Sequence, residues 1–287
     1  MGAVVARLGR FIGALAVGGR LLVGFPSSAP QPVAESDELQ IRFLDVGQAD
    51  AILITLGRQT VLVDAGRGDD IVQVLADYGI DSLVAAIASH NHDDHIGGMD
   101  AVLADFPVGR YLANGLAPAN TNAQNVDSWL RDKHIPHPGA PWEPILLGDA
   151  RITVFPTLLE GATENNSSLA VLVERGSFRA LLTGDSEAEE LNAWLEGGKI
   201  PDVDVLKAAH HGARNGVTPG WLDRTKPEVV VISVGANNSY GHPDPWTLRY
   251  YQTHGRKVYR TDLDGTVTVI VDRQGGYRIV TAGPVAR

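Results

Sequence analysis

The segment that decides the fold is Ser89-His90-Asn91-His92-Asp93-Asp94-His95-Ile96-Gly97-Gly98. It places three histidines and two aspartates within six residues, between an apolar run and a pair of glycines. Neutral imidazole and carboxylate groups suit zinc, manganese or iron, and zinc is the usual ion for a histidine-rich set. A lone histidine would more often lie on the surface or cap an element, but this density of ligand atoms predicts a metal centre.

The elements on either side of this segment alternate between strands and helices. Residues 82–89 form a short apolar run, which is typical of a strand covered on both faces. Periodicity and turn residues predict further strands at 39–43, 51–56, 60–64, 151–155, 169–173, 178–183, 203–206, 228–234 and 267–271, and helices at 71–78, 187–195 and 245–254. Two strand-rich halves that each carry helices fit two packed sheets with helices outside.

Composition and charge narrow the chemistry. The chain has 287 residues and is 44% hydrophobic, enough for one large domain or two small ones. It has no cysteine, so disulfides, thiolate ligands and a cysteine nucleophile are excluded and any metal falls to His, Asp and Glu. The net charge of −10 argues against a general grip on a polyanion. A local basic strip is still open to five residues in the last third of the chain, Arg214, Arg249, Arg256, Lys257 and Arg260. The alternative is that these charges are scattered over the surface.

The first 36 residues differ from the rest of the chain. Arginines precede an apolar stretch at residues 11–25, which Arg20 interrupts, and a Ser- and Pro-rich segment follows at 27–32. This order is typical of a secretory signal and linker, with a disordered extension as the alternative, and it is too short and interrupted to predict a membrane span. We therefore expect a leader and linker at 1–36, a domain at 37–287, and secretion or a cell-envelope location in preference to the cytoplasm.

The pattern His90-x-His92-x-Asp94-His95 resembles the defining motif of the metallo-β-lactamase superfamily. Within it, the chain is most similar to the hydrolase domain of ComEC-type DNA-uptake proteins. The similar segments, between residues 39 and 271, are 43–50 (FLDVGQAD), 63–66 (VDAG), 182–185 (LTGD), 210–212 (HHG), 240–243 (YGHP) and 261–265 (TDLDG). The resemblance implies an α/β fold, a four-layer αββα sandwich, and metal-dependent hydrolysis.

The resemblance also implies a ligand set for one or two Zn²⁺ ions, or for Mn²⁺. The expected metal ligands are His90, His92, Asp94, His95, Asp185 and His211, with Asp185 bridging the two ions. His210 and His211 end a predicted strand, where neighbouring side chains point to opposite sides, so they are not both expected to be ligands of one ion. We favour His211, and expect His210 to pack or to contact the substrate.

The remaining site predictions concern catalysis and substrate binding. Asp94, His210 and His242 are the candidate catalytic residues: Asp94 as a base, and His242 as a proton donor or oxyanion partner, with a plain turn histidine as its alternative. Many superfamily members have a third histidine for the first metal, where this chain has residues 165–169 (NNSSL). We expect the first site to be poorer in ligands, and Asn166 and Ser168, with His242, to bind the substrate.

Three further aspartates, Asp45, Asp50 and Asp64, are interpreted as structural, because carboxylates beside a metal loop commonly orient its imidazoles. For Asp64, a position in the lining of the pocket is the alternative. No Gly-x-Ser-x-Gly motif or phosphate-cradling glycine loop is present.

The expected function is metal-dependent hydrolysis of phosphodiester bonds, in DNA or in a smaller substrate. A metal-activated hydroxide would attack, since metals bring the pKa of bound water toward ~7. The alternatives are a lactone or lactam hydrolase of the same fold and a metal-binding module without catalysis. The sequence leaves the oligomeric state open.

Overall fold

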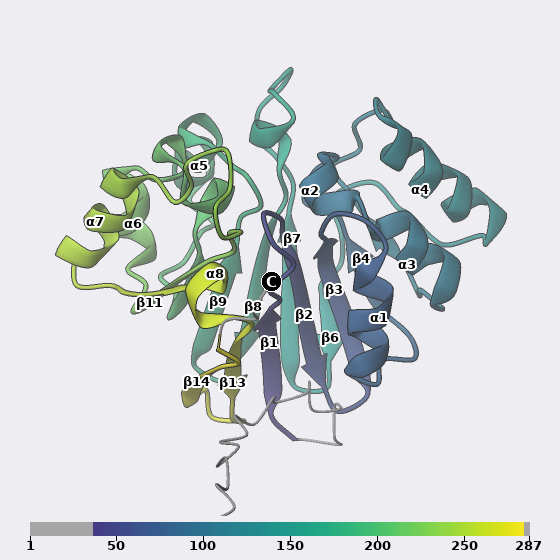
Figure 1. Ribbon diagram of the computed structural model, residues 1–287, viewed down its shortest axis with the longest axis horizontal. Helices are drawn as coiled ribbons and strands as arrows, with labels where there is room; N and C mark the ends of the chain where they lie inside the picture. Colours follow the sequence, from purple (N-terminus) through teal and green to yellow (C-terminus); the bar gives the residue numbers. More distant parts are fainter. Residues whose placement is uncertain (1–36, 284–287) are drawn as a thin grey trace, which may run out of the picture.

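The computed structural model describes residues 37–283, which form two seven-stranded sheets packed face to face with helices outside both (Figure 1). The predicted α/β sandwich is therefore confirmed. The predicted leader at 1–36 lies outside the described residues. Within residues 37–283, no helix is both long and apolar enough to cross a bilayer.

The first sheet contains antiparallel strands from both ends of the described chain and two short parallel strands at one edge. In spatial order it holds β14 (Tyr277–Thr281), β13 (Val267–Val271), β1 (Leu39–Phe43), β2 (Ala51–Leu56), β3 (Gln59–Ala65), β4 (Ala85–Ile87) and β5 (Tyr111–Leu112). Strands β3, β4 and β5 are parallel, and the other pairs are antiparallel.

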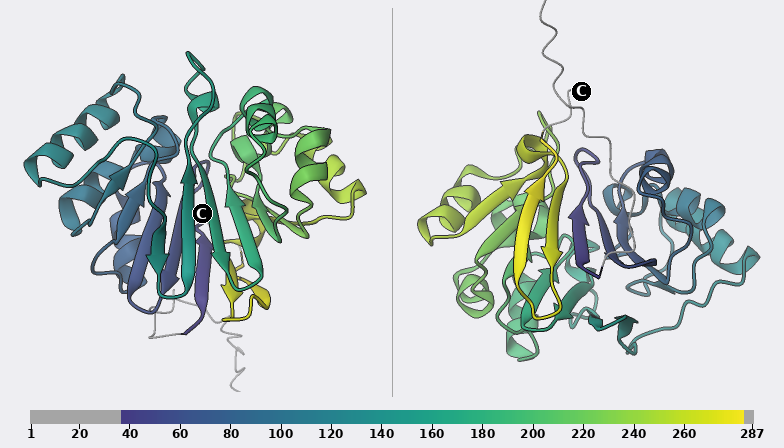
Figure 2. Two further views of the ribbon diagram at one scale, coloured as in Figure 1. Left: turned by 180° about the vertical axis from the view of Figure 1, so that it is seen from behind. Right: turned by 90° about the horizontal axis from the view of Figure 1, so that it is seen from below.

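The second sheet has the same mixed character, and its strands lie in front when the molecule is seen from behind (Figure 2). Its spatial order is β12 (Lys257–Arg260), β11 (Val229–Ile232), β10 (Val205–Lys207), β9 (Phe178–Leu182), β8 (Ala170–Arg175), β7 (Ala150–Phe155) and β6 (Ile145–Leu147). Strands β9 to β12 are parallel and β6 to β9 antiparallel.

Helices cover the outer face of each sheet (Figure 1). Those on the first sheet are α1 (Asp70–Asp77), α2 (Asp93–Ile96), α3 (Met99–Asp105) and α4 (Thr121–Asp132). Those on the second are α5 (Ala188–Glu196), α6 (Pro219–Thr225) and α7 (Pro245–Thr253), while α8 (Thr261–Asp264) links β12 to β13. Short 3-10 turns occur at η1 (Asn165–Ser167), η2 (Ala209–Gly212) and η3 (Arg214–Gly216).

Side-chain alternation along the strands builds the core. In β1, Leu39, Ile41 and Phe43 point into the space between the sheets. Strand β2 is buried at every position, with Ile52 and Ile54 facing the second sheet and the alternate residues facing the outer helices. Each such aliphatic side chain contributes about 1.5–3 kcal/mol through its removal from water.

The parallel strands position the functional side chains, because carboxyl ends of parallel strands meet at one edge of a sheet. Asp64, Ser89, Asp185 and Ser233 lie at or just after the ends of β3, β4, β9 and β11. Both sheets direct these ends to the same edge of the sandwich, so loops from the two halves meet there.

Candidate metal centre

The motif begins in the loop after β4 and ends in the short helix α2. His92 stands at the N-cap of α2 in extended conformation, and Asp94 and His95 lie within the helix. His90 and His95 are fully buried. This turn from strand to helix directs several imidazoles of the motif toward the edge where the two sheets meet.

A buried hydrogen-bond network fixes the orientation of the His95 ring. The Asp64 carboxylate accepts hydrogen bonds from His95 Nδ1 at 2.8 Å, from the Ser89 amide at 2.7 Å and from Ser89 Oγ at 2.8 Å. With the proton on Nδ1, the Nε2 lone pair of His95 faces Asp185 Oδ1 at 3.2 Å. Asp64 therefore orients His95, as the sequence interpretation of this residue anticipated.

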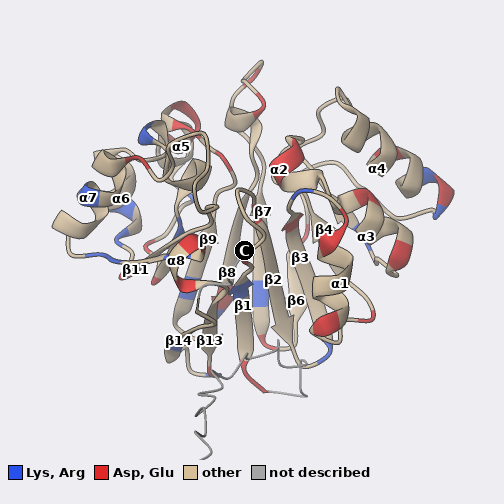
Figure 3. Ribbon diagram, in the orientation of Figure 1, with Lys and Arg blue, Asp and Glu red and all other residues tan. Residues whose placement is uncertain are grey.

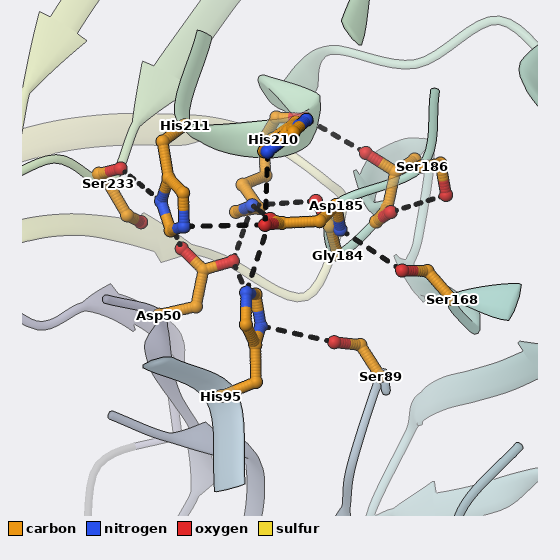
Figure 4. Close-up of polar contacts among 12 residues, drawn as sticks. Asp50, Ser89, His95, Ser168, Gly184, Asp185, Ser186, His210, His211 and Ser233 are labelled. Carbon is orange, nitrogen blue, oxygen red and sulfur yellow. Dashed lines mark hydrogen bonds and ion pairs between the residues drawn. The ribbon is translucent and has the colours of Figure 1, made fainter. Parts of the chain in front are cut away.

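The His211 ring is fixed in the same manner from the second sheet (Figure 4). Its Nδ1 lies 2.9 Å from the Ser233 carbonyl oxygen, to which it donates. Its Nε2 then faces Asp185 Oδ2 at 3.5 Å and Asp94 Oδ2 at 3.6 Å. Two imidazole nitrogens thus face carboxylate oxygens, and each contact is satisfied either by a proton on Nε2 or by a cation between the two atoms.

The pKa shifts of the clustered histidines and of Asp185 show that positive charge is favoured at this position. Burial opposes a charged imidazole, but Asp185 and Asp64 raise the pKa of His95 well above its usual value. Asp185 and Asp50 likewise raise the pKa of His211 against the effect of its burial. Burial would raise the pKa of Asp185, but His211, His95 and Lys207 hold it well below its usual value.

The convergent group fits a divalent metal ion. Ligand atoms of Asp94, His95, Asp185 and His211 all lie within 4.8 Å of one another. Among residues 37–283, His95 Nε2, His211 Nε2 and Asp185 Oδ1 are buried without a hydrogen-bond partner. Such orphaned acceptors cost free energy unless a cation joins them, so the donor set suits a metal such as zinc.

The Asp185 backbone is held by close packing around Gly184. Gly184 has φ 51°, and a Cβ there would lie 2.7 Å from the Ser89 Cβ, so a larger residue would push the two loops apart. The Asp185 amide donates to Ser168 Oγ at 3.1 Å. The Gly-Asp pair therefore places a carboxylate where loops from both sheets meet.

The sequence profile of the Metallo-beta-lactamase superfamily matches residues 44–236. The chain belongs to this superfamily. Its fold is that of metal-dependent hydrolases, and the family implies a divalent metal in the centre described above.

Curated relatives within the superfamily include competence proteins, which confirms the ComEC-type resemblance. The chain is 28% identical to ComE operon protein 3 of Bacillus subtilis over 81% of its own length and 33% of that protein. It is also 28% identical to competence protein ComA of Neisseria gonorrhoeae, over 89% of this chain and 35% of the relative. The chain thus spans about a third of the length of these relatives.

Solved structures support the fold. The metallo-β-lactamase fold protein YhfI of Bacillus subtilis has a TM-score of 0.52 at 14% identity, with 85% of this chain and all of that chain covered. CmlA, a diiron β-hydroxylase from Streptomyces venezuelae, has a TM-score of 0.53 at 18% identity over 86% of this chain and 54% of its own. At these identities the likeness shows the superfamily fold alone.

The other end of the superfamily centre has fewer ligands. His90 Nε2 and His92 Nδ1 lie 3.0 Å apart, close enough to share one ion. Burial lowers the pKa of His90 well below its usual value, so the ring is neutral and able to bind a metal. Among the described residues, no convergent group of three ligands includes either histidine, so any ion at this end has fewer ligands from the chain.

The predicted position of His210 and His211 at the end of a strand is wrong. They do not end a strand: β10 ends at Lys207, and both histidines have left-handed backbone conformations in η2, with φ near 50°. Strand alternation therefore does not separate them, and their Nε2 atoms lie 3.8 Å and 3.5 Å from Asp185 Oδ2. His210 is distinguished instead by its exposure to the pocket and by Glu187, 3.5 Å from its Nδ1.

The predicted substrate-binding residues Asn166 and Ser168 are placed differently from expectation. Asn166 is buried, donates to Glu189 at 3.1 Å and accepts from the Glu187 amide at 3.0 Å, so its side chain supports the start of α5. Ser168 is also buried and contacts His90 Nδ1 at 3.4 Å in addition to the Asp185 amide. Asn165, which the sequence-based assignment omitted, lines the pocket instead.

Lys207 is a second residue that the sequence-based assignment missed. It is fully buried beneath the centre, where its Nζ contacts Asp50 Oδ2 and donates to the Gly184 carbonyl oxygen at 2.9 Å. A lysine inside the apolar run at residues 203–209 was the available signal, because a buried ammonium requires a nearby carboxylate.

The centre opens into a pocket of about 490 Å³ between the two halves of the molecule. Its lining residues are Arg67, His92, Asp93, Asp94, Asn120, Asn165, Asp185, His210 and Tyr240. His242 is half-buried beside this lining, with its ring 5.5 Å from that of His210. Of the predicted ligands, His92, Asp94 and Asp185 face this pocket directly.

Proposed function

We propose that this domain is a metal-dependent phosphodiesterase that acts on DNA or on a smaller phosphodiester. The observation that carries the proposal is the convergence of His95 Nε2 and His211 Nε2 on the Asp185 carboxylate, with no hydrogen-bond donor between them among the described residues. The curated relatives among the competence proteins add support for DNA as the substrate.

The proposed metal ligands follow from this geometry. Asp94, His95, Asp185 and His211 would hold one zinc or manganese ion, and His90 and His92 would hold a second, more weakly. When bound, such an ion acidifies water and stabilises negative charge that develops on the substrate. The small number of ligands near His90 supports phosphodiester over lactam chemistry, because it leaves room for substrate oxygens.

Residues of the chain prepare the centre and the substrate for this reaction. Asp64 and Ser233 hold the two ligand rings, while Ser168 holds the Asp185 backbone. Burial opposes ionisation of Asp94, but its contacts with His211 and His95 lower its pKa, so this carboxylate is better suited to hold a cation than to take up a proton.

His242 has a role in this proposal that differs from that of a charged acid. Burial, followed by the nearby His210 and His211, lowers the pKa of His242. At neutral pH the ring is uncharged, and it can donate one N–H to an anionic oxygen of the substrate. We therefore propose His242 as a hydrogen-bond donor to the phosphate at the pocket wall.

The surface charge favours a short substrate. Figure 3 shows acidic residues on α2 and α3 and basic residues on α6 and α7. Among the described residues, the lining of the pocket itself contains one basic residue, Arg67, and three aspartates. Of the residues predicted to form a basic strip, Arg260 is paired with Asp262 at 2.9 Å, and Arg214 lies over the Trp246 ring at 3.8 Å. Because these side chains are engaged in contacts within the protein, the surface supports the end of a DNA strand or a small phosphodiester as the substrate, rather than a long DNA duplex.

A substrate panel tests the proposed function. Protein loaded separately with Zn²⁺ and Mn²⁺ is assayed with bis-p-nitrophenyl phosphate, nitrocefin and a lactone, after its metal content is measured. We expect turnover of the phosphodiester, and loss of more than about a hundredfold of it in Asp185→Asn together with lower metal content. Turnover of nitrocefin alone would contradict the proposed substrate class. A wild-type protein that binds no metal and hydrolyses none of the substrates would contradict the proposed enzymatic activity.

A further inference from the structure

The mouth of the pocket carries an arginine and a tyrosine that belong to neither group of metal ligands. Arg67 follows β3 of the first sheet, and Tyr240 lies in the loop between β11 and α7 of the second. Arg67 Nη2 lies 3.4 Å from Tyr240 Oη and 3.3 Å from Asp94 Oδ2. The two side chains therefore connect the halves of the molecule above the metal centre.

Arg67 is the one lysine or arginine among the residues that line this pocket. The same lining contains Asp93, Asp94 and Asp185, so an anionic substrate needs a positive group at the mouth. The Arg67 side chain is 49% exposed, and both of its contacts within residues 37–283 use Nη2. Its Nε and Nη1 donors remain open to a phosphate, for which the planar guanidinium is well shaped.

Tyr240 offers a flat apolar surface beside this cation. The residue is 58% exposed, and its ring stacks on His242 at a centroid distance of 6.0 Å and an interplanar angle of 14°. At this distance the two nearly parallel rings are offset, and much of the Tyr240 ring is left open to solvent. A large exposed aromatic side chain at the mouth of a pocket is suited to stacking a planar group of a ligand.

The loop that carries Tyr240 is braced. Asn238 Oδ1 accepts from the Tyr240 amide at 3.2 Å and from the His242 amide at 3.0 Å, and Asn238 Nδ2 donates to the His242 carbonyl oxygen at 2.6 Å. These bonds hold the tyrosine and histidine of the stacked pair in one arrangement, so less ordering of the loop is required when a ligand binds.

We propose that Arg67 and Tyr240 form a nucleotide subsite, in which the guanidinium binds the phosphate and the tyrosine ring stacks on the nucleobase. This inference rests on the proposed phosphodiesterase function and narrows its substrate to nucleotide phosphodiesters. Stacking tolerates any base, because every base has a flat π face, so the subsite selects nucleotides without selecting a sequence.

A matched pair of substrates isolates the nucleobase. Thymidine 5′-(p-nitrophenyl phosphate) and methyl p-nitrophenyl phosphate share the leaving group and the scissile bond, and differ in the thymidine. Tyr240→Ala is expected to lower kcat/KM for the thymidine ester roughly tenfold more than for the methyl ester, which senses only the contacts of Tyr240 with Arg67 and His242. Tyr240→Phe keeps the ring and should retain the preference for thymidine. An equal effect of Tyr240→Ala on both esters, or no effect on either, would overturn the subsite.

The arginine is tested with the same pair. Arg67→Ala is expected to raise KM for both esters by about tenfold or more, since a charge-assisted contact to the phosphate is common to both, and Arg67→Lys should recover part of the loss. Arg58→Ala is the matched control, because Arg58 is exposed in the hairpin between β2 and β3 and pairs with Asp81. An unchanged KM in Arg67→Ala would contradict the phosphate contact.

A binding measurement separates the subsite from the proposed function. Calorimetry of metal-loaded protein with thymidine 5′-monophosphate should show affinity that Arg67→Ala and Tyr240→Ala each reduce, in variants whose metal content and circular dichroism match the wild type. Binding with this dependence but without turnover would retain the subsite and reject the phosphodiesterase. Turnover without any preference for the thymidine ester would reject the subsite alone.

Discussion

Two buried groups of carboxylates share His95, and each receives positive charge from a different source. In the group of Asp50, Asp64 and His95, the Lys207 ammonium contacts Asp50 directly. In the group of Asp94, His95, Asp185 and His211, Lys207 Nζ is 3.9 Å from Asp185, and orphaned acceptors face one another across the pocket floor. A resident lysine thus pairs with the deeper group, although Asp50 Oδ1 has no hydrogen-bond partner among residues 37–283, while the outer group is left for a metal.

Glu190 is a buried carboxylate outside both of these groups. It is fully buried and accepts from Ser186 Oγ at 2.9 Å, and within residues 37–283 it contacts neither a cationic side chain nor the metal group. Burial raises its pKa to about 8, against hydrogen bonds that lower it. A lysine, a metal and a proton are thus three ways in which this fold accommodates carboxylates removed from water.

Replacing the buried lysine should have the largest effect on stability. Lys207→Met leaves Asp50 without its cation, and we expect the free energy of unfolding to fall by about 3–5 kcal/mol. Urea denaturation measures the change. The double variant Lys207→Met/Asp50→Asn should recover most of it, because it removes the uncompensated charge. If the double variant were no more stable than Lys207→Met, the ion pair would not be the cause.

The protonated carboxyl predicts a pH dependence with a definite sign. The pKa of Glu190 is about 8 in the folded chain against 4.5 as its ordinary value, so its favourable contribution is complete below about pH 4.5 and is lost as the pH rises through about 8. Each pH unit in this window costs at most about 1.4 kcal/mol, and local relaxation keeps the total to a few kcal/mol.

The Glu190→Gln variant checks that sign. It should lack this decline and be more stable than the wild type at pH 9, as measured by urea denaturation across the window. Glu196→Gln, an exposed change near the end of the same helix, is the control. Parallel pH profiles for the wild type and Glu190→Gln would show that the carboxyl is charged throughout.

The residue that orients His95 should affect metal affinity more than folding. Asp64→Asn weakens the acceptor of the His95 Nδ1 proton, and partners of metal-bound histidines typically contribute 10–100-fold in affinity. Titration with a competing chelator should show a loss of this size. Asp69→Asn, at an exposed position without a side-chain capping bond, is the control and should leave affinity unchanged.

The sequence was sufficient for the elements with strong periodicity. Strand β1 has the predicted bounds, and α7 differs from prediction by one residue, because the alternation of apolar residues and the proline at the helix start are local signals. The predicted strand at 82–89 is shorter, since only Ala85–Ile87 pair with neighbours. The motif His90-x-His92-x-Asp94-His95 identified the superfamily because its ligands are adjacent in sequence.

Elements and contacts that depend on distant residues were not predictable in this way. Strands β5 and β6 are two and three residues long, too short for any periodicity, and the polar helix α4 is buried at three positions only. The left-handed turn at His210 and His211 has no local signal beyond the following glycine. Lys207 and Asp50 are paired by the packing of the two sheets, so their contact follows from topology and not from spacing.

The exposed ion pair between Glu38 and Arg278 should have the smallest effect on the free energy of unfolding. Glu38 accepts from Arg278 through two bonds of 2.6 Å and 3.0 Å, close to the start of β1 and within β14, and this hydrogen bonding lowers the pKa of Glu38. Its contribution is therefore present above the ordinary pKa of a glutamate and is lost as the pH falls below it. Water screens the pair, so Glu38→Gln should reduce the free energy of unfolding by less than about 1 kcal/mol at pH 7. Urea denaturation of Glu38→Gln and Lys207→Met at one pH measures both losses of unfolding free energy. Equal losses would show that the size of the effect depends on the ion pair itself and not on its burial.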